Sequence, residues 1–178
     1  IAGYSAGMRI ESLSIVPMLA MGNAMSTFTA QNMGAGKIDR VKEGYRMCYV
    51  IVLTAGAVLC VMYQLAGGAF VSLFLDSGSS EAYSVGLSYV KFLSFFYSFI
   101  GLKASTDGLL RGAGDVTAFT VANLVNLAIR VSVTNLFAPV YGIQVAWMAV
   151  PLGWAANYVI SFGWYLTGKW KKVRVIKK

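Results

Sequence analysis

Long apolar stretches that are nearly free of charge dominate this sequence and limit it to a membrane-embedded fold. Three of them together contain one charged side chain, Arg130, and they lie at 12–33, 47–75 and 116–168. An apolar run of about 18 or more residues is long enough to cross the hydrocarbon core of a bilayer as a helix. The sequence therefore predicts an all-α protein that crosses the membrane several times.

The basic residues gather in alternate breaks between these stretches. Four lie within 34–46 and six within 169–178, whereas the breaks at 76–81 and 139–142 contain no Lys or Arg. In multi-span membrane proteins, Lys and Arg concentrate in the loops on the cytoplasmic side. We therefore expect a multi-pass protein of the cell (inner or plasma) membrane, with its basic loops and carboxy terminus in the cytoplasm.

The composition agrees with a membrane protein rather than a soluble domain. Hydrophobic residues make up 57% of the chain and charged residues 12%, whereas soluble domains contain roughly 25% charged residues. The net charge of +8 is a property that nucleic-acid-binding proteins share. Most of this excess, however, lies in the 169–178 tail, where it would attract anionic lipid. We expect membrane lipids as partners, and no nucleic acid.

Turn-forming residues divide the chain into the expected helices. These helices cover 4–33, 41–75, 81–110, 115–138 and 143–167. Gly34 and Gly36 are expected to end the first helix, Arg111-Gly-Ala-Gly114 is expected to end the third, and Asp115 is expected to cap the amides of the fourth. We predict an all-α polytopic transmembrane bundle of about five spans over 1–168, followed by a basic cytoplasmic tail over 169–178. The odd number of spans and the start without Met suggest a piece of a longer protein.

The glycine-rich turns at 34–36 and 112–115 do not indicate an enzyme. A dinucleotide-binding loop requires a preceding strand and the full Gly-x-Gly-x-x-Gly spacing, and the sequence has neither. Gly112-Ala-Gly-Asp115 matches the short Gly-x-Gly-Asp string of intramembrane aspartyl proteases. Such enzymes need two facing carboxylates, and Asp107 is the only other acid nearby. Because histidine and metal-ligand spacings are also missing, we expect no catalytic residue, metal or cofactor.

Three blocks of sequence are far more specific than the glycine turns alone. They are Ser5-Ala-Gly-Met-Arg-Ile-Glu11, Gln31-Asn-Met-Gly-Ala-Gly-Lys-Ile-Asp-Arg40 and Leu110-Arg-Gly-Ala-Gly-Asp115. In their spacing, and in the helices between them, they resemble the carboxy-terminal lobe of the multidrug and toxic compound extrusion (MATE) transporters over about 1–167. The family has twelve helices in two lobes, so the chain resembles helices eight to twelve. The implied missing partner is the amino-terminal lobe of the same parent chain.

The resemblance implies a secondary active antiporter. Such a protein exports organic, often cationic, compounds in exchange for H⁺ or Na⁺, and which of the two ions couples is left unassigned. In some members an acid lies near the middle of the tenth helix, where this chain has Phe99, Ile100 and Gly101. Two alternatives stay open: a flippase of the wider superfamily for lipid-linked saccharides, and a membrane scaffold component that does not transport.

Polar and polarizable side chains in the predicted spans are the candidates for binding a substrate or an ion. A central charge costs about 2.5–3.5 kcal/mol in a bilayer and therefore needs a reason. Arg130 lies deepest and Glu11 near the outer end of the first helix; each is expected either to bind a ligand or to pair with another group. Lys103 and Asp107 are four residues apart and are expected to form an ion pair. For the uncharged candidates the alternative is helix packing; they are Asn23, Asn123, Asn126, Met18, Met21 and Met25.

Overall fold

The structure is a computed structural model that describes residues 2–75, 80–142 and 144–172. Every regular element in these ranges is a helix, namely α1 (Ala2–Gly34), α2 (Ile38–Ser72), α3 (Ser80–Ser94), α4 (Tyr97–Gly112), α5 (Val116–Tyr141), α6 (Gln144–Leu166) and the 3₁₀ helix η1 (Lys169–Lys172). The predicted all-α bundle is confirmed. Of the predicted basic tail, residues 173–178 lie outside the described residues.

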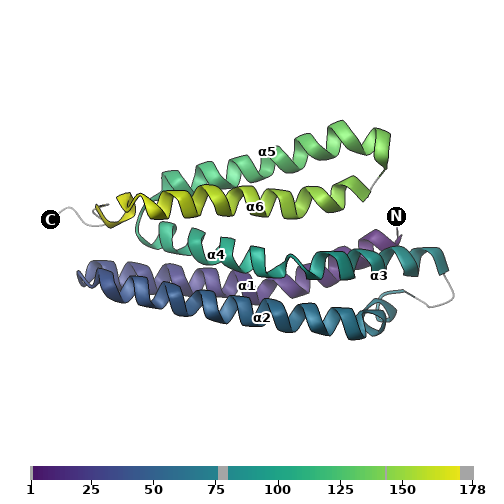
Figure 1. Ribbon diagram of the computed structural model, residues 1–178, viewed down its shortest axis with the longest axis horizontal. Coiled ribbons are helices and arrows are strands. Elements are labelled where there is room, and N and C mark those ends of the chain that lie inside the picture. The colour runs from purple at the N-terminus through teal and green to yellow at the C-terminus, as the bar shows by residue number, and fades with distance from the viewer. Residues whose placement is uncertain (1, 76–79, 143, 173–178) are drawn as a thin grey trace.

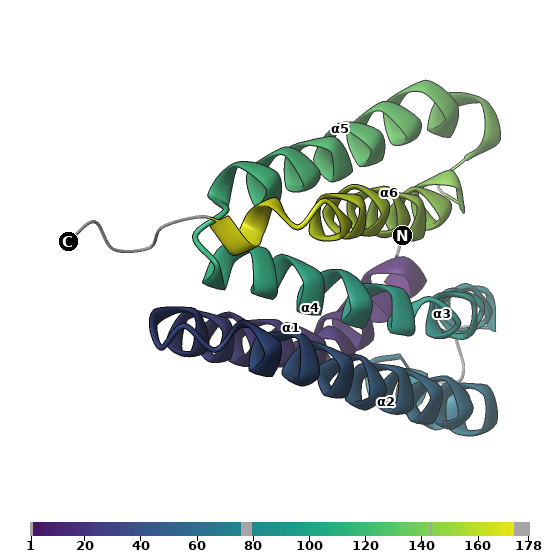
Figure 2. The ribbon, with the colours of Figure 1, turned by 60° about the vertical axis from the view of Figure 1, so that its left-hand side comes forward.

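The helices form two layers that extend along one long axis (Figure 1). One layer contains α1, α2 and the consecutive helices α3 and α4, and the other is the antiparallel pair of α5 and α6 (Figures 1 and 2). The helix α4 contacts α1, α2, α5 and α6. It is therefore the central helix, and its side chains form much of the interior of the bundle.

The prediction of one continuous helix over 81–110 is wrong, because the chain breaks between α3 and α4 and the two axes differ by 51°. Neither proline nor glycine causes this break. The carbonyl of Lys91 instead accepts hydrogen bonds from two side chains, Ser94 Oγ at 2.7 Å and Gln64 Nε2 at 2.9 Å. Polar side chains can replace lost helical hydrogen bonds in this way inside a membrane. Among the described residues, four helices are long and apolar enough to span a membrane, and there are five spans if the bent pair counts as one.

Two helix ends that were predicted from the sequence are confirmed. Gly36 and Gly114 follow α1 and α4 with φ of 71° and 82°, in the left-handed region that glycine adopts without strain. Asp115 caps α5 by accepting a hydrogen bond from the amide of Ala118 at 3.3 Å. These local signals place the two turns that connect α1 to α2 and α4 to α5.

The end of α5 differs from the prediction, which placed it near Ala138. The helix continues through Pro139 to Tyr141. Gly142 then ends it with a φ of 80°, and its N–H donates to the carbonyl of Ala138 at 2.9 Å. The stop signal is therefore the glycine rather than the proline, since membrane helices tolerate proline.

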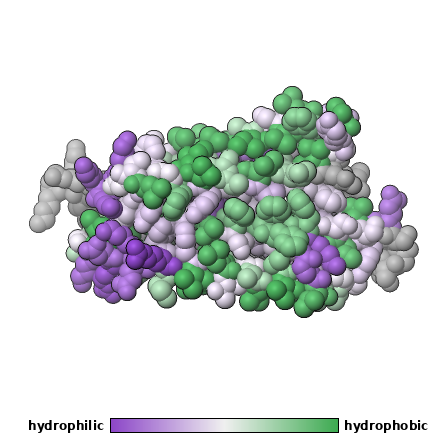
Figure 3. Space-filling view, viewed as in Figure 1, coloured by the Kyte–Doolittle hydropathy of each residue, from purple (hydrophilic) through white to green (hydrophobic). Residues whose placement is uncertain are grey.

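The surface separates into an apolar flank and a hydrophilic end. Hydrophobic residues cover much of the long flank, and hydrophilic residues gather at the end that holds the α1–α2 turn (Figure 3). Several large apolar side chains face outward from the flank, among them Leu65, Leu13 and Val159 at 84%, 66% and 67% exposure. The turn between α1 and α2 and the helix η1 lie at the same end of the bundle (Figure 1). The basic segments thus share one end, as the sequence predicts.

Glycines allow α1 and α4 to approach until their backbones touch. A Cβ atom placed on Gly108 would lie 2.1 Å from the carbonyl oxygen of Gly22, and one on Gly22 would lie 2.6 Å from the carbonyl of Ala104. Small residues give close helix contacts in membranes, where apolar side chains gain little by leaving lipid. This contact brings polar side chains of α1 and α4 to one common cleft.

Candidate functional site

A cleft of about 250 Å³ opens between α1, α4 and α5. Its charged lining comes from α4, at positions 103, 107 and 111, which are spaced four residues apart and so share one helix face. It is lined by Leu19, Gly22, Asn23, Lys103, Ala104, Asp107, Gly108, Arg111, Phe119 and Asn123. Three of the predicted site residues, Asn23, Asp107 and Asn123, are therefore brought together.

Asp107 is the centre of a polar network in this cleft, and its side chain is almost fully buried. Lys103 Nζ lies 3.0 Å from Asp107 Oδ2, so the predicted ion pair is confirmed. Asn123 Nδ2 donates to the same oxygen at 3.3 Å, and Ser161 Oγ of α6 donates to Oδ1 at 2.7 Å. Lys103 Nζ also donates to Asn123 Oδ1 at 3.1 Å. The carboxylate thus connects three helices, and both of its oxygens are occupied.

The network continues from Asp107 into the seam between α5 and α6. Ser161 Oγ lies 3.4 Å from Asn157 Oδ1, and the amide nitrogen of Asn157 is buried without a hydrogen-bond partner among the described residues. Asn126, a predicted site residue, lies in the same seam, and its Oδ1 is likewise buried and unpaired. Most buried polar atoms in proteins have a hydrogen-bond partner. A donor and an acceptor therefore stay unused next to the Asp107 network.

Arg111 occupies the mouth of the cleft. Its Nη2 donates to Asn23 Oδ1 at 2.7 Å, which gives the predicted residue Asn23 a defined contact. The guanidinium lies over the ring of Phe119, with its carbon 5.6 Å from the ring centre. In the sequence, Arg111 is only part of the turn that is expected to end the third helix. The arrangement of α1 and α5 around it shows that it also faces the cleft.

Glu11 lies elsewhere, in the amino-terminal half of α1, and this half of the helix is at the end of the bundle opposite the α1–α2 turn (Figure 1). Its Oε2 accepts a hydrogen bond from the Tyr89 hydroxyl at 2.5 Å. Two further rings meet Tyr89 edge-on, Tyr4 and Trp147, each with a centroid distance of 5.3 Å. In the described part of the chain Glu11 forms no ion pair within 4 Å, although the charge of Arg130 acts on it from a longer distance.

Arg130 is exposed on α5 and forms no ion pair with any residue that the structure describes. Its side-chain stem packs against α6 where Gly153 leaves room, since a Cβ on that glycine would lie 2.9 Å from Arg130 Cγ. Arg130 is not part of the cleft lining. Whether it binds a ligand stays a prediction.

Comparison with known proteins places the chain in a family. The MatE family model matches residues 1–150. The chain belongs to the MatE family. It is 28% identical over 176 residues to the "Probable multidrug resistance protein YpnP" of Bacillus subtilis, covering 98% of this chain and 39% of that protein. It is 22% identical to the "Probable multidrug resistance protein NorM" of Thermotoga maritima, covering 99% of this chain and 38% of that protein.

A solved structure has the same fold as this MatE chain. It is described as "Inward-facing conformation of a multidrug resistance MATE family transporter of the MOP superfamily", and it matches with a TM-score of 0.81 at 19% identity. The match covers 92% of this chain and 37% of the other. The chain therefore spans about two fifths of the length of the relatives it matches, and the MATE resemblance predicted from three sequence blocks is confirmed.

The methionine row of the MatE chain lies mostly in the core. Met18 is fully buried and Met25 is 3% exposed. Met21 and Met25 also line a separate apolar hollow of about 270 Å³ against α2, with Met47 among its walls. Side chains in these positions pack between helices, and helix packing was the alternative to ligand binding for these three methionines. A role in binding substrate stays a prediction.

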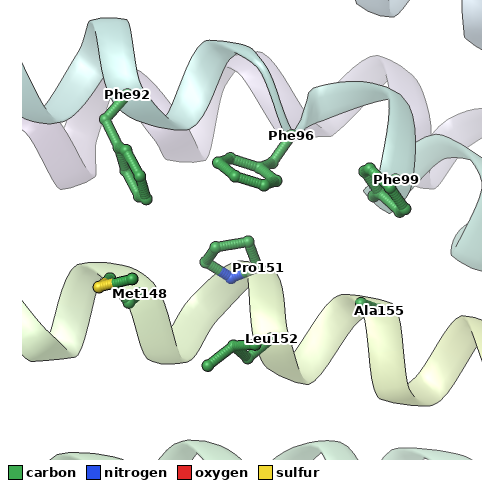
Figure 4. Close-up of a pocket in the computed structure, with 7 residues that line it drawn as sticks. All are labelled: Phe92, Phe96, Phe99, Met148, Pro151, Leu152 and Ala155. Carbon is green, nitrogen blue, oxygen red and sulfur yellow. The ribbon is translucent and has the colours of Figure 1, made fainter.

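An apolar hollow at the α3–α4 break was not predicted. The rings of Phe92, Phe96 and Phe99 point from the bent helix pair toward Pro151 and its neighbours on α6 (Figure 4). The hollow has a volume of about 180 Å³. Its phenylalanines have the spacing of an ordinary lipid-facing helix surface, so only the bend and the position of α6 reveal the hollow in this MatE chain.

Proposed function

We propose that this chain is the carboxy-terminal lobe of a secondary active antiporter that exports organic compounds, often cationic, in exchange for inward flow of H⁺ or Na⁺. The family and the names of its relatives support drug efflux as the broad activity. In this proposal the basic end faces the cytoplasm of a cell (inner or plasma) membrane, by the bias of Lys and Arg toward that side. The lipids and the amino-terminal lobe are its partners.

The polar network around Asp107 is the observation that carries the proposal. Ionisable side chains inside membrane spans are expensive and mark substrate or ion pathways. Here Lys103 and Asp107 lie in a cleft between three helices, with uncharged polar groups in contact. A membrane scaffold needs no such cleft. An antiporter needs polar groups at a site that two lobes share and move around during alternating access, and a cleft in this lobe can supply its part of that site.

Ethidium efflux from cells that express the full-length protein tests this proposal. Efflux is measured with both gradients present, with Na⁺ removed, and with the proton gradient collapsed. We expect efflux that stops under one of the last two conditions, and that condition identifies the coupling ion. A strain that expresses the Asp107→Asn variant, compared at an equal level of folded protein, is expected to show reduced efflux, because this change disrupts the network around Asp107.

The two alternatives give different results in the same assay. A scaffold component gives no efflux above the empty-vector strain under any condition. A flippase for lipid-linked saccharides leaves ethidium retention unchanged but moves a labelled lipid-linked saccharide across vesicle membranes. Either result would overturn the proposed antiport of organic compounds.

A further inference from the structure

The cleft between α1, α4 and α5 carries an unbalanced positive charge. It contains two cations, Lys103 and Arg111, and one acid, Asp107. The Asp107 carboxylate already forms an ion pair with Lys103 and accepts hydrogen bonds from Asn123 and Ser161. Arg111 has no acidic partner among residues 2–75, 80–142 and 144–172. Both carboxylate oxygens of the nearby Asp115 also have partners, because they accept hydrogen bonds from the amide of Ala118 and from Trp164 Nε1.

The guanidinium of Arg111 is held in place by groups that carry no charge. Nη2 donates to Asn23 Oδ1 at 2.7 Å, and Nε lies 3.4 Å from Ser26 Oγ. The ring of Phe119 supports its face. A guanidinium has five N–H donors, so these contacts orient Arg111 and leave donors free at the mouth of the cleft. An oriented guanidinium with free donors is suited to two-point binding of a carboxylate or a phosphate.

The other walls indicate a ligand with an apolar part. Leu19 and Phe119 lie at two sides of the cleft, and the close backbone contact of α1 and α4 at Gly22 and Gly108 forms its floor. Lys103 lies two helical turns deeper than Arg111, about 12 Å along α4 at 1.5 Å per residue. A molecule in the cleft thus meets a free cation at the mouth, apolar walls, and a neutralised ion pair at the far end.

We propose that this cleft binds the anionic group, a phosphate or a carboxylate, of an amphiphilic molecule, with Arg111 as the residue that binds it. The proposal rests on the cleft being part of the substrate path proposed above. A lipid headgroup and a water-soluble organic anion share this chemistry. With this proposal the lobe has two separate charged sites. Glu11 supplies a negative charge toward the outer end, and Arg111 supplies a positive charge near the basic end.

Charge compensation within the cleft tests the proposal. Asn23→Asp places a carboxylate where Asn23 Oδ1 now accepts from Arg111, so it supplies an internal anion without removing the guanidinium. Gln31→Glu is the matched control, because it adds the same charge at an exposed position of α1 that does not line the cleft. The full-length protein is placed in phosphatidylcholine nanodiscs. Binding of phenyl phosphate is measured by calorimetry at constant ionic strength, and thermal unfolding with and without phosphatidylglycerol in the disc.

If the cleft binds soluble anions, phenyl phosphate binds the unmodified protein and Gln31→Glu, and its dissociation constant rises at least tenfold in Asn23→Asp. If it binds a lipid headgroup, phenyl phosphate does not bind, and phosphatidylglycerol raises the unfolding midpoint of the unmodified protein and of Gln31→Glu but not of Asn23→Asp. Equal responses of all three proteins, or none, would overturn the proposal.

A second variant keeps the test valid if Asn23→Asp does not fold. Arg111→Gln removes the charge, Arg111→Lys keeps it, and only the second is expected to retain part of the anion response. Because these measurements report binding and not transport, a protein that exports ethidium but ignores both anions would sink this inference alone. Anion binding without any efflux would contradict the proposed function instead.

Discussion

Two membrane-embedded acids of this chain, Asp107 and Glu11, have opposite surroundings. Asp107 has both oxygens occupied, by Lys103, Asn123 and Ser161 from three helices. Glu11 accepts one hydrogen bond, from Tyr89, has aromatic rings nearby, and forms no ion pair with a described residue, although the charge of Arg130 acts on it from beyond ion-pair distance. The difference indicates that the two acids have different roles. A carboxylate in a close ion pair inside the bundle holds helices together, whereas one without a cation in contact is available to bind one.

The strongest test of this contrast is Asp107→Asn, for which we expect a loss of about 3 kcal/mol in the free energy of unfolding. Removing one partner of a buried ion pair leaves the other charge buried and uncompensated, and the Lys103 and Asp107 side chains are only 14% and 6% exposed. Chemical or thermal unfolding of the full-length protein in detergent measures the change. The double variant Lys103→Met, Asp107→Asn should recover part of the loss.

The exposed ion pair of α2 is the matched control for this experiment. Lys42 and Asp39 are 2.7 Å apart, but Asp39 is 95% exposed. Exposed pairs contribute little because water screens them, so Asp39→Asn should leave the unfolding transition unchanged. Equal effects of Asp39→Asn and Asp107→Asn would show that the Asp107 network does not hold the helices together.

A smaller effect is expected from Ser161→Ala. This change removes one donor to Asp107 Oδ1 and leaves the ion pair with Lys103 intact. Hydrogen bonds to charged groups contribute about 1.5–3 kcal/mol in water-soluble proteins, and side-chain bonds between membrane helices average roughly 0.6 kcal/mol. We expect a loss of about 1 kcal/mol in unfolding free energy. Ser12→Ala, at an exposed serine of α1, should have no effect. If the two serine variants behave alike, the contact from α6 contributes nothing.

What the sequence predicts correctly is local. The apolar runs predict the spans, the glycines at 36 and 114 predict the helix stops, and the four-residue spacing predicts the Lys103–Asp107 pair. Each of these signals is carried by residues within one continuous stretch of sequence. Helical geometry then fixes their relation without any knowledge of how the helices pack.

What the sequence does not predict depends on distant contacts. The α3–α4 break has no proline or glycine, and Gln64 of α2 stabilises it across the bundle. Ser161 reaches Asp107 from 54 residues further along the chain. The unbalanced charge of Arg111 becomes visible only when the partners of Asp107 and Asp115 are known. The polar residues of the site are thus recognisable in the sequence, but their pairing is set by tertiary packing.

For Glu11 the expected change is in binding and not in folding. Glu11→Gln keeps an oxygen that can accept from the Tyr89 hydroxyl, so the unfolding free energy should change by less than about 1 kcal/mol. The negative charge is lost, and we expect the affinity for ethidium to fall about tenfold, or about 1.4 kcal/mol. Fluorescence polarization of ethidium with the purified full-length protein measures the affinity. Glu43→Gln, at an exposed acid of α2, is the control with equal charge change. If both variants bind ethidium as the unmodified protein does, Glu11 is not a cation site, and the contrast with Asp107 reduces to a difference in packing.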